Sequence, residues 1–162
     1  MQLKELVFPE LSIGAVMPEA ADKVRPMELA DLDIKFSFSI IKEESLGFAS
    51  LSIRSKRAPE IEQCLNYKFD IKAFAAFHLD ETEPVDAKLE FTRKFNAAAT
   101  LVGALREQLA QLTSRGPWGV TVMPMIPLQQ LAGKYPDAEL VASTKKPSLR
   151  PGKRIKARVA AK

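Results

Sequence analysis

The sequence predicts an α+β fold, in which a four-stranded antiparallel sheet is covered on one face by a long helix and a short second helix follows. Two observations support this prediction. Apolar and polar residues alternate in several runs between residues 32 and 79, which is the pattern of half-buried strands. Leucines then recur at helical spacing from Leu101 to Leu112. Because the strand patterns come first and the helical pattern last, an antiparallel sheet is favoured over a repeated β-α unit.

Four strands are expected in the first half of the chain. Residues 3–13 alternate loosely and give the first strand. Residues 14–28 contain two prolines and are interpreted as a long irregular crossover, a kind of loop that is usually functional. Residues 32–40 alternate most clearly, and after a turn at 42–45 the run at 46–53 completes a hairpin. Residues 65–79 give the fourth strand.

The long helix contains a wide apolar surface and a clear end. Its apolar pattern runs from Phe95 to Leu112 and stops at Thr-Ser-Arg-Gly. Gly116 suits the left-handed residue that follows many helices, and Pro117 prevents the helix from continuing. Pro124 then interrupts an extended connector, and Pro127 suits the first turn of a second helix, expected over residues 127–135.

The order of long helix, Ser-Arg-Gly turn, proline-containing connector and amphipathic helix resembles the end of the bacterial export chaperone SecB and its family. Upstream, residues 3–79 resemble that family only in the order of strands. The resemblance implies an ATP-independent chaperone that binds unfolded polypeptides, working as a homotetramer built as a dimer of dimers. The matching residues are Ser114, Arg115, Gly116, Val120, Val122, Pro124 and the helix at 127–135.

A groove for unfolded polypeptide is implied by this resemblance, with the crossover as one wall and the second helix as the other. Methionine suits a surface that accepts many apolar partners, although each methionine taken alone is also typical of a core. The second helix has an apolar face that could equally cover its own core. The implied groove residues are Val16, Met17, Val24, Met27, Leu128, Leu131 and Tyr135.

An oligomer interface is predicted on the long helix, because its apolar surface is wider than the single stripe needed to cover a sheet. The simplest second neighbour is the same helix of another subunit, in agreement with the tetramer of the SecB family. The alternative is a wider core within one chain. The predicted interface residues are Leu101, Leu105, Leu109 and Leu112.

Composition and length indicate one globular domain followed by a basic tail. The chain has 162 residues, 46% of them hydrophobic and 27% charged, which is average for a globular protein. We place a SecB-like domain at residues 1–136 and the tail at 137–162. No apolar run is long enough to cross a bilayer, the N-terminus lacks a signal-peptide pattern, and Cys64 is the single cysteine. We therefore expect a cytoplasmic protein with no membrane insertion and no internal disulfide.

The tail determines the charge balance. Residues 145–162 hold eight Lys or Arg and no acidic residue, which leaves 16 basic against 20 acidic residues in the rest. This composition predicts disorder. The SecB family binds the motor SecA through acidic groups, but here Lys68 and Gly14 stand at expected acidic positions and only Glu10 is retained. These departures weigh against SecA, and leave open an antitoxin of a toxin–antitoxin pair, a phage protein, or RNA bound through the tail.

Catalytic and cofactor motifs are missing from the sequence, so an enzyme is not expected. His78 is the single histidine and sits at the end of a predicted strand, which favours an exposed surface residue. Cys64 has no neighbours that would lower the pKa of its thiol, which favours a structural role. The seven glycines form no phosphate-binding loop, so no nucleotide, metal or other cofactor is expected.

Overall fold

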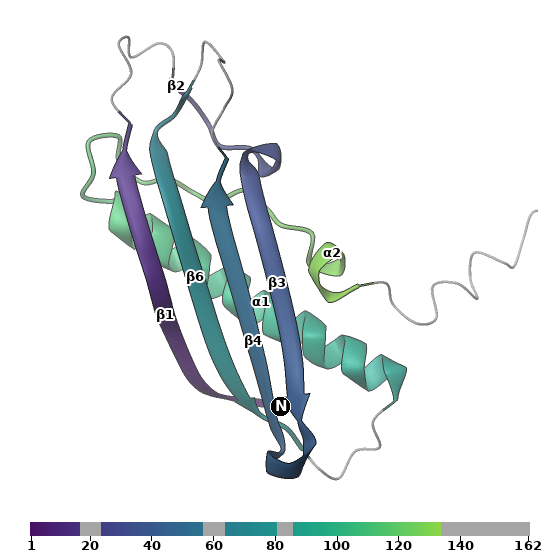
Figure 1. The fold of residues 1–162 in the computed structure, drawn as a ribbon. Helices are drawn as coiled ribbons and strands as arrows, with labels where there is room; N and C mark the ends of the chain where they lie inside the picture. The colour runs from purple at the N-terminus through teal and green to yellow at the C-terminus, as the bar shows by residue number, and fades with distance from the viewer. Residues whose placement is uncertain (17–23, 57–63, 81–85, 134–162) are drawn as a thin grey trace, which may run out of the picture.

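The fold is an open antiparallel sheet with its helices on one side (Figure 1). The computed structural model describes residues 1–16, 24–56, 64–80 and 86–133. The four strands of the sheet are β1 (Gln2–Ala15), β3 (Leu32–Ile41), β4 (Leu46–Ser55) and β6 (Tyr67–His78). They lie in the order β1-β6-β4-β3, and every neighbouring pair is antiparallel. The predicted fold class and the four predicted strands are therefore confirmed.

The predicted hairpin is formed by β3 and β4. Leu32 pairs with Ser55 and Ile41 with Leu46, so the register is regular along all ten residues of each strand. The chain reverses through a 3₁₀ turn, η3 (Lys42–Glu44), and through Ser45, whose φ of 51° is left-handed. By contrast, β1 at the opposite edge has two register shifts against β6. Such irregularities bend an edge strand and make it a poorer template for unwanted pairing.

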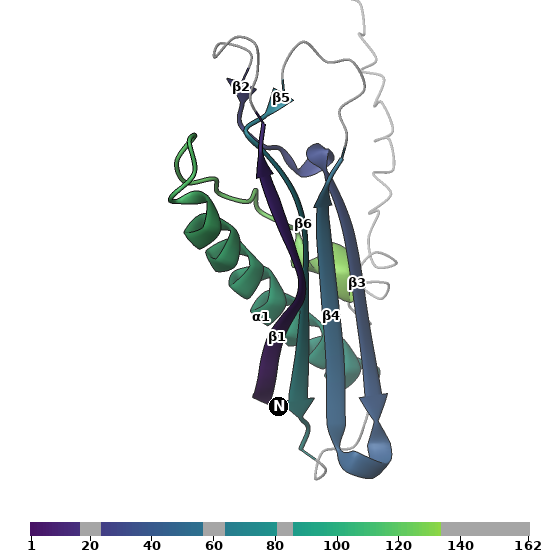
Figure 2. The same ribbon diagram turned by 60° about the vertical axis from the view of Figure 1, so that its left-hand side comes forward.

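One long helix, α1 (Ala87–Thr113), lies across one face of the sheet (Figure 2). It begins before the predicted stretch, where the Asp86 side chain accepts a 2.6 Å hydrogen bond from the Leu89 amide. The second helix, α2 (Leu128–Ala132), is shorter than the predicted 127–135. It ends because Gly133 has a φ of 92°, a conformation that glycine adopts at little cost.

The core lies between α1 and the sheet. The fully buried side chains of the sheet include Leu51, Ile53 and Ile71, and α1 contributes Leu101 and its neighbours one and two turns on. Two residues between α1 and α2, Met123 and Ile126, are also buried in this core. The segment that joins the helices is therefore part of the folded layer and not a loose linker.

Small elements fix the end of the crossover. β2 (Val24–Arg25) pairs in parallel with β5 (Cys64–Leu65), and a 3₁₀ turn, η2 (Leu29–Asp31), leads into β3. The sequence predicted an irregular crossover over residues 14–28, and residues 17–23 of it lie outside the described part. The two-residue β2 was not predicted, because two residues are too few for a periodic pattern.

Gly116 does not have the predicted left-handed conformation. The positive φ angles among the described glycines are those of Gly119 and Gly133. A side chain at Gly116 would instead collide with the hydroxyl of Tyr67, which lies well inside van der Waals distance of a Cβ built there. Glycine is required here because the turn after α1 approaches the start of β6 closely. The spacing of residues in the sequence does not reveal this contact.

The opposite face of the sheet is polar at one end and apolar at the other. At the polar end Ser37 and Ser50 share a 2.8 Å hydrogen bond, and the Lys72 ammonium lies 3.6 Å from the Glu10 carboxylate. Lys35, Ser39 and Lys68, at alternate positions of the same strands, are exposed. At the other end Phe48 and Phe74 stack at 5.8 Å, which the alternation did not predict. Among the described residues, no helix has the length and apolar character of a membrane span.

Candidate functional site

Three apolar side chains project from the connector between α1 and α2. Val120 is 58% exposed, Val122 is 62% exposed and Met125 is 79% exposed, whereas Met123 and Ile126 point inward and are buried. This alternation of outward and inward side chains is typical of an extended chain that covers a core on one side. The connector crosses the sheet on the same side as α1 (Figure 1). We refer to Val120, Val122 and Met125 as the apolar strip.

The hydroxyl of Thr113 attaches the connector to the end of α1. Thr113 is fully buried, and its Oγ1 donates a 2.8 Å hydrogen bond to the Leu109 carbonyl. The same oxygen accepts a 2.9 Å hydrogen bond from the Thr121 amide. Since both groups are held inside the fold, the connector has a fixed starting point beside the helix.

Tyr67 fixes the turn that precedes the connector. Its hydroxyl accepts a 3.2 Å hydrogen bond from the Trp118 amide and lies 3.2 Å from the Gly119 carbonyl, to which it can donate. Tyr67 begins β6 and is almost completely buried. The turn is therefore held by the sheet itself, at the position where Gly116 leaves room for the tyrosine.

Trp118 links this turn to the end of β1. Its indole Nε1 donates a 2.8 Å hydrogen bond to the carbonyl of Val16, and the Val16 amide donates a 2.9 Å bond to the Asn66 carbonyl. The ring is half-buried. Trp118 thus holds the residue that follows β1 next to the connector, although 102 residues separate the two positions in the chain.

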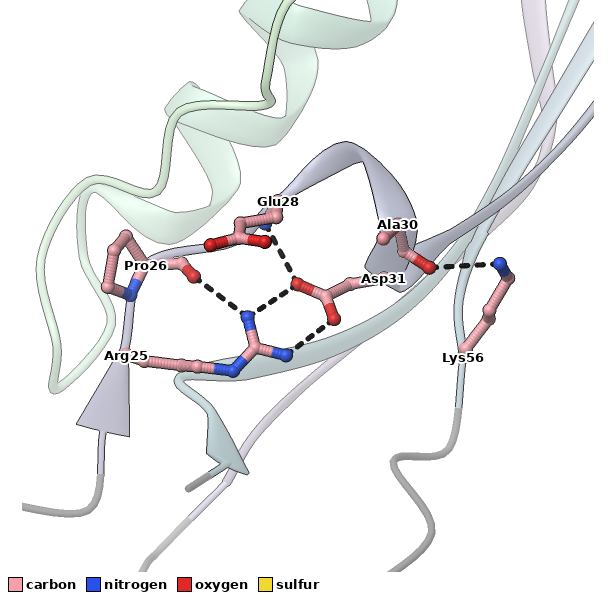
Figure 3. Close-up of polar contacts among 6 residues, drawn as sticks. All are labelled: Arg25, Pro26, Glu28, Ala30, Asp31 and Lys56. Atoms are coloured by element: carbon pink, nitrogen blue, oxygen red, sulfur yellow. Dashed lines mark hydrogen bonds and ion pairs between the residues drawn. The ribbon is translucent and has the colours of Figure 1, made fainter. Parts of the chain in front are cut away.

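A bidentate ion pair holds the other end of the crossover (Figure 3). The Arg25 guanidinium donates to both carboxylate oxygens of Asp31, at 2.7 and 2.5 Å, and Asp31 also accepts a 2.8 Å bond from the Glu28 amide. The hydrogen bond from Arg25 lowers the pKa of Asp31, and it raises the pKa of Arg25 in return. Because the fork of an arginine fits a carboxylate in one geometry, the pair fixes the direction in which residues 25–31 run.

A cavity of about 300 Å³ lies between the crossover and the connector. Met27 comes from the crossover, and Val120 and Val122 come from the apolar strip. The amide oxygen of Asn66, another lining residue, is buried and has no hydrogen-bond partner in the described part of the chain. The lining residues are Arg25, Pro26, Met27, Leu65, Asn66, Tyr67, Val120, Thr121 and Val122.

The predicted groove residues are only partly brought together. Met27 lies beside the apolar strip, and Val16 and Val24 lie at the two described ends of the crossover. Leu128 and Leu131 are half-buried and pack against the core, so their side chains also stabilise the fold. Met17 and Tyr135 lie outside the described residues. A role for any of these residues in binding stays a prediction.

The strip was not among the predicted groove residues, although a signal for it was present. Val120 and Val122 are spaced by two in a stretch bounded by Pro117 and Pro124. Prolines at both ends keep a segment out of a central strand, so one of its faces has no strand to cover it. The sequence could not say which of the two faces would be buried, because that depends on how the connector crosses α1 and the sheet.

The predicted interface leucines divide into two groups. Leu101, Leu105 and Leu109 are 0–2% exposed within a single chain and pack against its own sheet. Leu112 is 39% exposed. Of the four predicted interface leucines, Leu112 is therefore the one whose side chain is open to a second chain. The interface itself stays a prediction.

The two reactive residue types found in the sequence, histidine and cysteine, lie near opposite ends of β6. His78 is exposed at the end of β6, as its sequence position predicted, and Cys64 lies in β5. Within residues 1–16, 24–56, 64–80 and 86–133, no three His, Cys, Asp or Glu side chains are grouped as a metal site would require. On the helix-covered side of the sheet, the chemically distinctive exposed side chains are those of the apolar strip.

Comparison with protein families gave no matching family model, and no curated relative matches the sequence. Among solved structures, a SecB-like chaperone of Mycobacterium tuberculosis, in complex with a peptide from the HigA1 antitoxin, is similar to the chain. The similarity covers 78% of this chain and 90% of that one, with a TM-score of 0.47 and 14% identity. A protein of unknown function from Streptococcus agalactiae is also similar, with a TM-score of 0.39 and 10% identity over 76% of this chain and 95% of that one. Similarity at this level is too low to bear on function.

Proposed function

We propose that this protein is an ATP-independent chaperone that holds unfolded polypeptides against the apolar strip. The observation that carries the proposal is the exposure of Val120, Val122 and Met125 on a connector held rigidly by Thr113, Tyr67 and Trp118. Apolar groups that are exposed together on an ordered segment, beside a cavity, are typical of a binding surface.

Such a surface suits unfolded chains better than one folded partner. Burying apolar area contributes about 25 cal/mol per Å² and has no directional requirement, so many sequences bind with similar strength. Methionine at the most exposed position adds a flexible side chain that adapts to different partners. In this proposal the protein releases its client without hydrolysing a nucleotide, when the client folds or is transferred to another protein.

A homotetramer, built as a dimer of dimers, is part of the proposal. A larger assembly would place several strips on one particle and allow one long client to contact more than one of them. Light scattering at micromolar concentration would measure the mass, and a monomer would exclude the tetramer. Leu105→Glu is not a clean test of this interface, because Leu105 is buried in its own chain and its loss would damage the fold.

Two kinds of partner fit the chaperone proposal. In an export role the holding protein passes its client to the motor SecA, and in a toxin–antitoxin role the client is an antitoxin. The basic residue Lys68 is exposed on the polar end of the sheet, and Glu10 faces Lys72. Because this surface carries both signs of charge, it gives little support for a contact with SecA through acidic side chains. Direct binding of purified SecA would separate the two roles, because a chaperone dedicated to an antitoxin would not bind SecA.

The decisive experiment measures suppression of aggregation. Reduced α-lactalbumin, a slowly folding and unrelated protein, would be allowed to aggregate with and without the full-length chain, and light scattering would be followed. We expect aggregation to be suppressed at about one tetramer per client. No suppression at that ratio, or with a several-fold excess, would exclude general chaperone activity.

A second candidate function is an RNA- or ribosome-associated accessory protein that acts through its basic tail. The observation that favours it is the concentration of eight basic residues in 145–162, which would release counterions from phosphates on binding. Deleting residues 145–162 separates the two functions. The chaperone proposal predicts that client holding survives the deletion, and the accessory function predicts that a salt-sensitive RNA contact disappears with the tail.

A further inference from the structure

We infer that the client binds as an extended strand whose backbone pairs with the connector at Val120 and Val122. This inference rests on the proposed chaperone function and specifies its mode of binding. The occupant is a segment of unfolded polypeptide with apolar side chains at alternate positions. Addition of a strand to a free edge is a known mode of peptide recognition, in which main-chain hydrogen bonds contribute affinity and alternate side chains contribute selectivity.

The direction of the backbone groups supports strand pairing. In an extended chain the N–H and C=O groups of successive residues point to opposite sides. The Thr121 amide points to α1, where it donates to Thr113 Oγ1. The N–H and C=O groups of Val120 and Val122 therefore point away from α1.

These backbone groups have no partner in the described part of the chain. No hydrogen bond within the described residues involves the main-chain groups of Val120 or Val122. Val120 and Val122 are also more than half exposed, so a second chain can reach them. Most backbone groups of a folded protein are hydrogen-bonded. Backbone donors and acceptors that are ordered but have no hydrogen bond form the template that an added strand requires.

The space beside the connector is consistent with an added strand. The cavity of about 300 Å³ borders Val120 and Val122 on one side and Met27 on the other. Apolar side chains of the client would then contact the strip and Met27.

Charge further limits the occupant. Arg115 is the only charged residue in the sequence from Thr113 to Gly133, and it is exposed. The connector thus offers a client no carboxylate and one guanidinium that has no ion-pair partner within residues 1–16, 24–56, 64–80 and 86–133. A client segment with neutral or acidic residues between its apolar positions complements this surface better than one with lysines.

The test uses a synthetic ten-residue peptide that carries fluorescein, with leucine at alternate positions and serine or glutamate between them. Two further versions carry N-methyl groups, one on every odd amide and the other on every even amide. In strand pairing only one of these sets faces the connector. We expect one version to bind the full-length protein at least about fivefold more weakly, and the other to bind like the parent peptide.

The outcomes separate this inference from the proposed function. Equal binding of the two methylated versions, whether strong or weak, would overturn strand pairing, because an apolar groove does not distinguish the two sets. A parent peptide that fails to bind would overturn it as well. If reduced α-lactalbumin is still held in either case, the chaperone function stands and only the mode of binding is wrong.

A matched pair of variants tests the same point from the protein side. Val122→Pro removes an amide that has no partner among the described residues but keeps an apolar ring. Val122→Ala keeps the amide and shortens the side chain. Strand pairing predicts that Val122→Ala binds the parent peptide several-fold more tightly than Val122→Pro. The reverse order, with both variants showing wild-type thermal unfolding, would contradict it. If Val122→Pro does not fold, the two N-methylated peptides still decide the question, because they test strand pairing on the wild-type protein.

Discussion

The indole of Trp118 donates a 2.8 Å hydrogen bond to the carbonyl of Val16, and so connects the turn after α1 with the part of the crossover that directly follows β1. Both walls of the candidate site depend on this contact. The turn leads into the apolar strip, and the crossover returns at Arg25 and Met27 on the far side of the cavity. A change at Trp118 should therefore affect the site as well as the stability of the fold.

Trp118→Phe is expected to lower the free energy of unfolding by about 1–2 kcal/mol, because the phenyl ring retains most of the packing but leaves the Val16 carbonyl without its donor. Urea unfolding followed by circular dichroism would measure the change, since the variant lacks the only tryptophan. Faster amide exchange at residues 14–16 should accompany it. Unchanged stability together with unchanged exchange would mean that the hydrogen bond holds neither segment.

Gly116→Ala should destabilise the protein by about 1–3 kcal/mol, because a methyl group would overlap the Tyr67 hydroxyl. The control is the same change made in a Tyr67→Phe background, where the nearest colliding atom is absent. Thermal unfolding of the four proteins forms a double-mutant cycle. If Gly116→Ala costs as much in the Tyr67→Phe background as in the wild type, the collision is not the reason for the glycine.

The Arg25–Asp31 pair predicts a dependence of stability on pH. The pKa of Asp31 is lowered in the folded protein, chiefly by the hydrogen bond from Arg25. A lowered carboxyl pKa contributes stability that is complete above the unfolded value near 4 and is lost as the pH falls through the lower folded value. The stability difference between wild type and Asp31→Asn should therefore be constant from about pH 7 to pH 5 and shrink below about pH 4.

Urea titrations at several pH values would measure that difference, which we expect to reach up to about 1 kcal/mol for this partly exposed pair. Asp33→Asn is a suitable control, because Asp33 lies 3.8 Å from Lys35 on an exposed surface. A stability difference for Asp31→Asn that grows as the pH falls would contradict the assigned direction of the pKa shift.

Met125→Asp and Leu131→Asp should have opposite effects. Met125 is 79% exposed, so aspartate there should change the free energy of unfolding by less than about 0.5 kcal/mol while weakening the holding of reduced α-lactalbumin. Leu131 is half-buried against the core, so aspartate there should cost about 1–3 kcal/mol of stability. Thermal unfolding and aggregation assays on both variants would measure this. Client holding that is lost with Leu131→Asp, at unchanged stability, would instead support the second helix as a wall of the groove.

Local pattern was sufficient for most of the fold. The alternation at residues 32–40 and 46–53 determined the hairpin of β3 and β4, because a strand has a period of two and a shift by one residue would place every apolar side chain in water. The leucine spacing determined that α1 is a helix, and the Thr-Ser-Arg-Gly sequence located its end. These are properties of neighbouring residues, and they need no knowledge of the rest of the chain.

The sequence by itself therefore determined the four strands of the sheet and the two helices, their order along the chain, and the apolar face of the β3–β4 hairpin and of α1. Only the tertiary structure decided that Leu101, Leu105 and Leu109 cover their own sheet, that Gly116 makes room for Tyr67, and that Val120 and Val122 project from the connector. The physical reason is that the exposure of a side chain depends on which other segment of the chain packs against it. Periodicity identifies an apolar face, but a partner such as Tyr67 or Trp118 comes from a distant part of the chain and becomes a neighbour only when the layers pack.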